Sequence, residues 1–292
     1  MTRLRSTAMM LGGLSFVLAA CQPSTAARTK EPVVPNTAGH GVTPIAYAAH
    51  GGSASTEATL HIEPSGDGRM FLGSTMSLPT AGDLDAVGTF AGKVDARRLK
   101  RVTELLRTLP DLAAPAPPVP GSVVRSLSFS GAGGPVELMI PGYAEAPLDE
   151  VERLLQEVMV ALVSTPASTI RVQVDVADDG PGLVLSSAGA SPARVRLVDG
   201  DGRVTARGTV VVLGADGSMY GTSSLDPATV TTAAPAGVLD LAPGDRLRFP
   251  VAPPDEVPKG PVLLSGGLEL DLELDGTFRR ISAQALQVPF GR

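Results

Sequence analysis

Residues 268–276 read Leu-Glu-Leu-Asp-Leu-Glu-Leu-Asp-Gly, and this stretch decides the fold of the C-terminal half of the chain. The strict alternation of leucine with acidic residues predicts a β-strand with one buried face and one solvated face. Asp275-Gly276 is typical of a hairpin turn, so a second strand is expected over residues 278–288.

The acidic side chains that alternate with the leucines, Glu269, Asp271, Glu273 and Asp275, are expected on one face. Neighbours along that face are about 6.7 Å apart, too far to share one metal ion unless a second strand contributes. We therefore predict a charged outer face that keeps the strand soluble, opposite Arg279 and Arg280 across the turn. A metal site or an acid–base pair is the alternative interpretation.

Residues 166–292 show no helical periodicity and contain many short apolar or alternating runs separated by Gly, Pro and Asp. This spacing predicts about seven or eight short strands and an all-β sandwich of immunoglobulin-like type without its usual disulfide. Other Greek-key sandwiches fit the same pattern. The expected strands cover residues 172–176, 183–185, 193–198, 204–213, 239–241, 246–249, 263–274 and 278–288.

Residues 56–165 combine strands with two amphipathic helices. Apolar residues recur at steps of three and four between Asp95, a good N-cap, and Pro110, and again from Pro147 to Val163. With strands expected near 57–63, 70–78, 86–93, 123–129 and 136–140, these residues predict an α+β domain. Both helices are expected on one face of an antiparallel sheet. The basic outer face of the first helix is interpreted as solvated, an acidic partner or lipid headgroup being the alternative.

Residues 1–20 have the composition of a secretory signal peptide. Arg3 and Arg5 precede an apolar run over residues 8–18, about eleven residues and too short to span a bilayer as a helix. Leu18-Ala19-Ala20-Cys21 resembles the lipobox of bacterial lipoproteins. The resemblance implies cleavage before Cys21, with lipid, including palmitate, attached at that residue. Gln22 stands where Asp typically retains such proteins in the inner membrane, which implies the outer membrane.

Residues 21–55 are expected to form a lipidated, disordered tether, because Pro, Ala, Thr, Ser and Gly dominate and little could bury a core. A flexible chain of this length reaches roughly 30 Å. His40 and His50 lie in this segment and are interpreted as solvated residues, a metal-binding role being the alternative.

Composition excludes several classes of function. The chain has 24 Lys and Arg against 30 Asp and Glu, and removing the signal peptide with its two arginines changes the net charge from −6 to −8. This charge disfavours nucleic-acid binding and leaves the lipid as the membrane anchor. Since Cys21 is the only cysteine, no disulfide, cysteine nucleophile or cysteine-based zinc site is expected. The chain has no Trp and three Tyr, so aromatic platforms for sugars or single-stranded DNA are disfavoured.

No motif of recognised chemistry occurs in the mature sequence. It lacks a Gly-x-Ser-x-Gly elbow and a His-Glu-x-x-His motif, and His61 is expected to point to solvent from a strand. Residues 88–93 depart from phosphate-loop spacing. Asp199 and Asp201 begin like a calcium loop without its later carboxylates, so a turn is expected there. We therefore predict no catalytic, cofactor-binding or metal-binding residues and no cofactor.

Two pattern resemblances concern protease inhibitors. Pro243-Gly244-Asp245 and Pro258-Lys259-Gly260-Pro261 each precede a strand, and this stretch resembles the late hairpins of bacterial intracellular proteinase inhibitors, which are immunoglobulin-like sandwiches. The order of strand pair, helix ending at Leu109-Pro110-Asp111-Leu112, hairpin and final helix is similar to that of emfourin-type metalloprotease inhibitors. These resemblances imply protease inhibition, but no inhibitory residue matches.

Together these features favour a lipid-anchored lipoprotein of the cell envelope with a non-catalytic role. That role is either binding of an envelope protein partner or a structural one. Inhibition of an envelope protease is the first alternative, and an enzyme of unrecognised chemistry is the second.

Overall fold

The computed structural model describes residues 44–52, 56–78, 84–109, 120–131, 134–140, 142, 144–252 and 260–291. The predicted signal peptide, Cys21 and His40 lie outside the described residues, as does most of the predicted tether. No helix among the described residues combines the length and the apolar character needed to cross a membrane.

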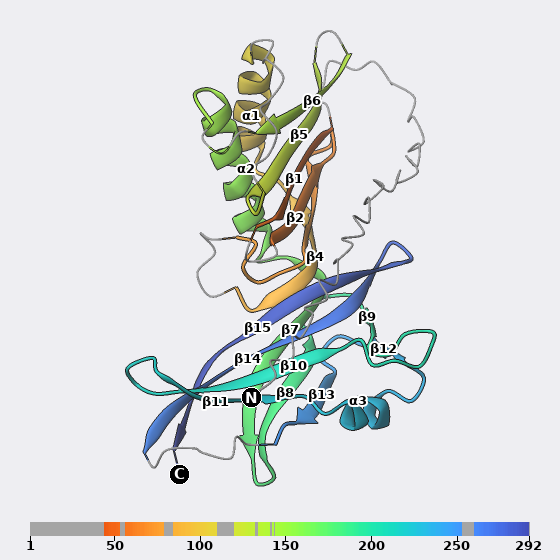
Figure 1. The fold of residues 1–292 in the computed structure, drawn as a ribbon. Helices are drawn as coiled ribbons and strands as arrows, with labels where there is room; N and C mark the ends of the chain where they lie inside the picture. The colour runs from red at the N-terminus through yellow and green to blue at the C-terminus, as the bar shows by residue number, and fades with distance from the viewer. Residues whose placement is uncertain are drawn as a thin grey trace, which may run out of the picture. The chain divides into compact units, whose positions relative to one another are not determined.

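The first sheet has nine strands, which pair antiparallel in the order β13-β8-β7-β4-β3-β2-β1-β5-β6 (Figure 1). Its strands are β1 (Ile45–Gly51), β2 (Thr56–Ile62), β3 (Asp67–Leu72), β4 (Ala86–Lys93), β5 (Val123–Gly131), β6 (Gly134–Ile140), β7 (Pro166–Ala177), β8 (Gly180–Ser187) and β13 (Arg246–Pro250).

Strand β1 corrects the prediction that residues 21–55 form a disordered tether. Residues 45–51 pair with β2 on one side and with β5 on the other, so this segment lies inside the sheet. Ile45 and Tyr47 are 1% and 3% exposed and belong to the first hydrophobic core. Burial of these two large side chains outweighs the loop-like composition around them.

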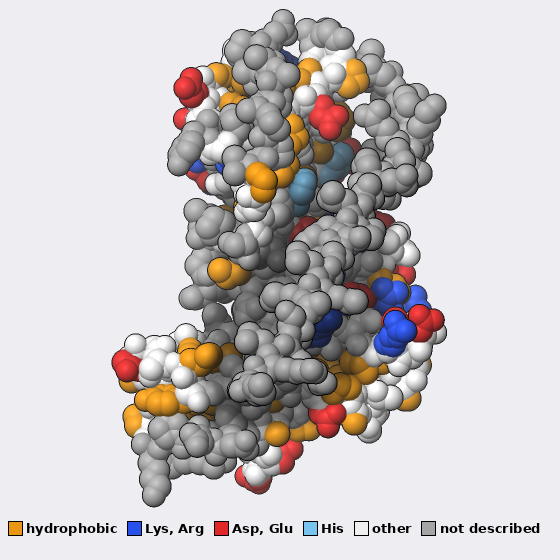
Figure 2. Space-filling model, in the orientation of Figure 1, with side chains coloured by type: hydrophobic (Ala, Val, Ile, Leu, Met, Phe, Trp, Pro, Cys, Tyr) orange, Lys and Arg blue, Asp and Glu red, His pale blue; other side chains and the backbone are white. Residues whose placement is uncertain are grey.

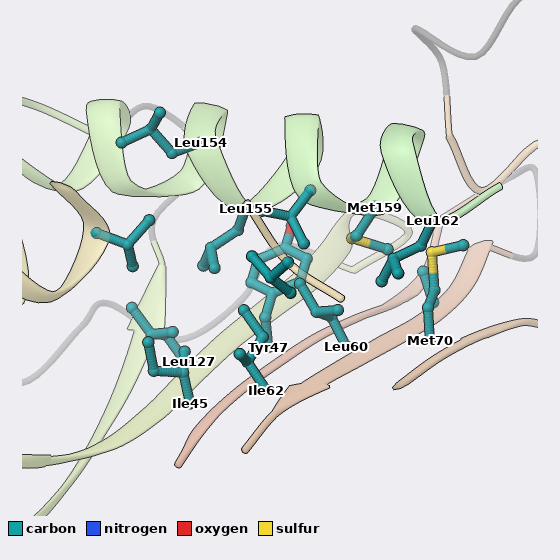
Figure 3. Packing of buried hydrophobic residues seen from close by; sticks show 14 of the residues in the cluster. Ile45, Tyr47, Leu60, Ile62, Met70, Leu127, Leu154, Leu155, Met159 and Leu162 are labelled. Carbon is teal, nitrogen blue, oxygen red and sulfur yellow. The ribbon is translucent and has the colours of Figure 1, made fainter. Parts of the chain in front are cut away.

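Two helices, α1 (Ala96–Thr108) and α2 (Leu148–Leu162), cover one face of the first sheet, as the sequence predicted (Figure 1). Asp95 caps α1 by accepting hydrogen bonds from the backbone N–H groups of Arg97 and Arg98. Figure 3 shows how side chains of α2, including Leu155 and Met159, point towards those of the strands. The apolar residues spaced three and four positions apart therefore form the helix side of the core between the helices and the sheet.

The second sheet has six strands. Its strands are β9 (Ala193–Arg196), β10 (Arg207–Leu213), β11 (Met219–Ser224), β12 (Val238–Leu241), β14 (Pro261–Leu274) and β15 (Thr277–Gly291). They pair antiparallel, in the order β11-β10-β14-β9-β12 with β15 also on β14. Because β15 follows one edge of β14 along its length, β10 and β9 share the other edge one after the other. The short helix α3 (Pro227–Ala233) follows β11.

A second hydrophobic core lies between β7 and β8 of the first sheet and the strands of the second sheet. Phe71 and Val87, from β3 and β4, also belong to it. Strand β4 pairs with β7, so the first sheet continues without a break across the predicted domain boundary at residue 166. The prediction of mostly antiparallel β-structure with two packed layers is confirmed. Assignment to the immunoglobulin-like class stays a prediction.

The strand predicted over residues 70–78 ends at Leu72, and the following loop contacts β15 instead. Ser74 forms a parallel bridge with Ser282. The Ser282 N–H donates to the Gly73 carbonyl at 2.7 Å, and the Thr75 N–H donates to the Ser282 carbonyl at 3.3 Å. This loop therefore covers part of the free edge of β15.

Candidate functional site

The outer face of the second sheet is the face that points away from the second core. On β14 the leucines of the alternating stretch point inward, and Leu268, Leu270 and Leu272 are at most 1% exposed. The acidic residues between them point outward, which confirms the predicted division of this strand. Figure 2 shows basic and acidic side chains gathered where Figure 1 draws β9 and the turn between β14 and β15.

Asp271 lies at the centre of an ion-pair network on this outer face. Arg196 of β9 donates from Nε and Nη2 to Asp271 Oδ2 at 3.1 and 2.9 Å. Arg280 of β15 approaches Asp271 Oδ1 at 3.5 Å and Glu269 at 3.3 Å, and it also donates to the Thr205 carbonyl at 2.7 Å. These contacts leave Asp271 8% exposed although it faces away from the core.

The network continues towards the edge of the sheet. Arg194 of β9 pairs with Glu273 at 3.1 Å and with Asp240 of β12 at 3.3 Å. The guanidinium of Arg196 also lies 4.5 Å from the centre of the Phe278 ring, a cation–π distance. We call Arg194, Arg196, Asp240, Glu269, Asp271, Glu273 and Arg280 the ion-pair network.

Arg280 lies opposite the acidic face as predicted, but the prediction for Arg279 was wrong. In the β14–β15 register Arg280 is opposite Asp271, whereas Arg279 is opposite Leu272 and so points to the other face. There Arg279 lies 3.8 Å from Glu57 and 5.8 Å from the centre of the Phe71 ring. Side chains of consecutive residues in a strand point to opposite faces of the sheet, so Arg279 and Arg280 cannot both face the acidic residues.

A groove of about 300 Å³ lies beside the ion-pair network on the same outer face. We call it the Gly267 groove; it is lined by Arg207, Thr209, Val211, Ser265, Gly266, Gly267, Leu268, Glu269 and Gln284. Gly267 lies between Thr209 on β10 and Gln284 on β15, so a row across three strands lacks its middle side chain. A Cβ atom at Gly267 would come within 2.8 Å of Gln284 Oε1. The glycine therefore creates the hollow and makes room for the glutamine.

Four polar side chains of the Gly267 groove are not engaged with the described part of the protein. No side-chain hydrogen bond or ion pair is made there by Arg207, Thr209, Ser265 or Gln284, although the other arginines of this face are all paired. Arg207 is opposite Glu269 in the register, but Glu269 is bonded to Arg280. The groove thus offers a guanidinium, two hydroxyls and an amide to another molecule.

Other residues singled out in the sequence show no convergence towards a reactive centre. His61 points outward from β2 and lies 3.0 Å from Glu63. Asp199 accepts hydrogen bonds from the backbone N–H groups of Asp201 and Arg203, which makes it a turn residue as expected. Within the described residues, no three His, Cys, Asp or Glu side chains could hold a metal ion.

Three of the five basic residues of α1 are paired with acidic residues. Arg101 donates to Glu150 of α2 at 2.9 Å, Arg98 lies 3.4 Å from Glu157, and Lys100 lies 3.8 Å from Glu104. This pairing favours the interpretation of a solvated helix face over a surface for an acidic partner.

One buried polar cluster was not predicted. Glu152 of α2 accepts two hydrogen bonds of 2.8 Å from Arg125 of β5, one on each oxygen. It also accepts one of 3.1 Å from the Tyr47 hydroxyl of β1. Burial and the negative charge of Glu152 raise the pKa of Tyr47, so the phenol stays a donor. The cluster connects α2 to strands β1 and β5 of the first sheet.

Comparison with known proteins adds little to this geometry. No protein-family model matches the chain, and no curated protein matches it. A crystal structure described as a "putative carbohydrate binding protein" from Bacteroides uniformis is similar over 87% of this chain and 89% of that chain, at 9% identity and a TM-score of 0.24. A TM-score this low carries no argument about fold or ligand, so no family is assigned to the chain.

Proposed function

We propose that the protein is a lipid-anchored lipoprotein of the cell envelope, held at the outer membrane through Cys21, with a non-catalytic binding role. Its partner is a protein of the envelope, and the binding site is the Gly267 groove together with the adjacent ion-pair network. The role needs no cofactor and no nucleic acid.

The observation that carries this proposal is the set of unengaged polar groups in the Gly267 groove. A partner side chain could exchange water for hydrogen bonds with Thr209 and Gln284, and Arg207 suits an acidic group on the partner. The paired arginines next to the groove limit the movement of the surrounding side chains, which lowers the entropic cost of binding. The groove is shallow and contains no histidine, which favours binding over acid–base chemistry.

The binding role is tested by chemical crosslinking of the anchored protein in its own envelope, followed by pull-down and identification of partners. The double variant Arg207→Ala/Gln284→Ala is compared with the wild type and with Arg97→Ala. Arg97 is an exposed arginine of α1, away from the groove, and serves as the matched control. Loss of the captured partner in the double variant alone supports the proposal. Equal capture by all three proteins contradicts it.

The anchor is tested separately by replacing Cys21 with serine. The variant is expected in the soluble fraction, whereas the wild type sediments with membranes. Undiminished sedimentation of the variant contradicts a lipid anchor at this residue. Since this experiment does not involve the groove, its outcome leaves the binding test independent.

A further inference from the structure

Strand β11 forms one end of the second sheet, and its outer edge has no strand against it among the described residues. Its sequence, Met-Tyr-Gly-Thr-Ser-Ser, contains no charged residue and no proline. Proteins usually protect exposed edges with charges, prolines or very short strands. The other edges carry such protection: Pro135 and Glu137 on β6, Arg246 and Pro250 on β13, Asp240 on the four-residue β12, and Arg279 and Pro289 on β15.

The hydrogen-bond pattern shows which backbone groups of β11 point outward. The Leu225 N–H donates to the Gly208 carbonyl at 2.8 Å, so this residue faces β10. In an antiparallel pair every second residue bonds to the same neighbour, and Ser223 and Gly221 therefore also face β10. Thr222 and Ser224 direct their N–H and C=O groups to the open side. They are available to pair with another strand.

The side chains at the start of β11 add apolar surface beside this edge. Met219 is 67% exposed and Tyr220 is 47% exposed, the former being the most exposed large hydrophobic residue among those described. The Tyr220 ring lies beside Gly214 of the turn before β11, where a Cβ atom would come within 2.8 Å of a ring carbon.

We propose that β11 pairs antiparallel with β11 of a second copy of this chain. A two-fold dimer places the same strand on both sides of the interface, and like charges opposite one another are destabilising. Self-pairing is therefore favoured for a strand without charge, because no register then places like charges opposite one another, and β11 alone among the described sheet edges has no charged residue. Six residues at about 3.3 Å each give a paired length of roughly 20 Å. Pairing joins the two second sheets into one and leaves the Gly267 groove of each copy outside the interface.

The test is sedimentation velocity of the full-length chain in mild detergent over a range up to about 100 µM, where weak self-association becomes visible by mass action. Thr222→Pro removes an outward N–H and leaves the ladder with β10 intact, and Gly221 before it tolerates the restricted backbone. Thr222→Ser, which keeps the N–H, is the matched control. We expect a dimer for the wild type and the control, and a dissociation constant raised at least about tenfold for Thr222→Pro.

Two further measurements keep the result decisive. Thermal unfolding of Thr222→Pro shows whether the fold is retained, and Ser224→Pro removes the other outward N–H if the first variant is unstable. A wild-type chain that remains monomeric throughout overturns the proposal. A dimer equally stable in both folded proline variants also overturns it, as does a β11 edge that captures a different protein in the envelope and shows no self-association.

Discussion

Replacing Arg125 tests whether the buried cluster around Glu152 holds α2 on the first sheet. The Glu152 side chain is 8% exposed and the Arg125 side chain 20%. In Arg125→Ala the carboxylate stays in its buried position and keeps the Tyr47 hydroxyl at 3.1 Å but loses both 2.8 Å bonds from the guanidinium. Removing one partner of a buried ion pair costs about 3–5 kcal/mol of unfolding free energy.

Two other substitutions give a graded series. Tyr47→Phe leaves the Arg125–Glu152 pair intact and removes one hydrogen bond to a charged group, which costs about 1.5–3 kcal/mol. Glu152→Leu replaces the buried charge with an apolar side chain, and Arg125 still donates to the Gly142 carbonyl at 3.0 Å. We therefore expect Glu152→Leu to be less destabilising than Arg125→Ala, because it leaves no buried carboxylate without its cation.

The assay is urea unfolding followed by circular dichroism, with the free energy of unfolding obtained by linear extrapolation. Arg107→Ala, at an exposed position in the last turn of α1, is the control and should cost no more than about 1 kcal/mol. The reasoning is refuted if Arg125→Ala costs no more than this control. It is also refuted if Glu152→Leu is the most damaging variant of the series.

Three more predictions concern other parts of the fold. Hydrogen bonds to Asp67, the strongest of them from Lys93, hold the pKa of its carboxyl group below the usual range. Lys93→Met is therefore expected to raise the pKa of Asp67, which NMR titration of the carboxyl group measures. A lowered carboxyl pKa stabilises the folded state at pH values above the usual pKa of a carboxyl group. The stability that Lys93 adds is therefore lost as the pH falls through the pKa of Asp67 in the folded protein. Gly266→Ala places a Cβ 2.8 Å from a core methyl group and should cost about 1–3 kcal/mol in urea unfolding. Asp271→Asn weakens the ion pair with the 34%-exposed Arg196, and we expect a loss of only about 1 kcal/mol, lessened by added salt.

Much of the fold could be predicted because its elements have strong local patterns. Both long helices show apolar spacing of three and four residues, and the Leu-Glu-Leu-Asp alternation of β14 separates its faces as expected. Strand β1 was missed because alanines occupy three of its seven positions, so only two large residues mark its buried face. Strand β11 is largely exposed and α3 buries only Val230, so neither has an apolar pattern to detect.

The candidate site was predictable only in part. The sequence identifies the acidic face of β14 and its neighbour Arg280, since both lie within one hairpin. Arg196 and Arg194 of β9 lie 75 and 79 residues from Asp271 and Glu273 in the chain, and no local pattern predicts these pairs. The hollow at Gly267 depends likewise on the registers of two strand pairs, which place Thr209 and Gln284 on either side of it.

The central claim is that the Gly267 groove binds an envelope protein, and site-specific photo-crosslinking tests it most directly. A photoreactive residue is placed at Thr209, in the groove, and in a parallel strain at Thr232, an exposed threonine of α3. After irradiation of intact cells, the account predicts a discrete crosslinked product from position 209 that is absent from position 232. Irradiation that yields no product from position 209, or the same products from both positions, would contradict it.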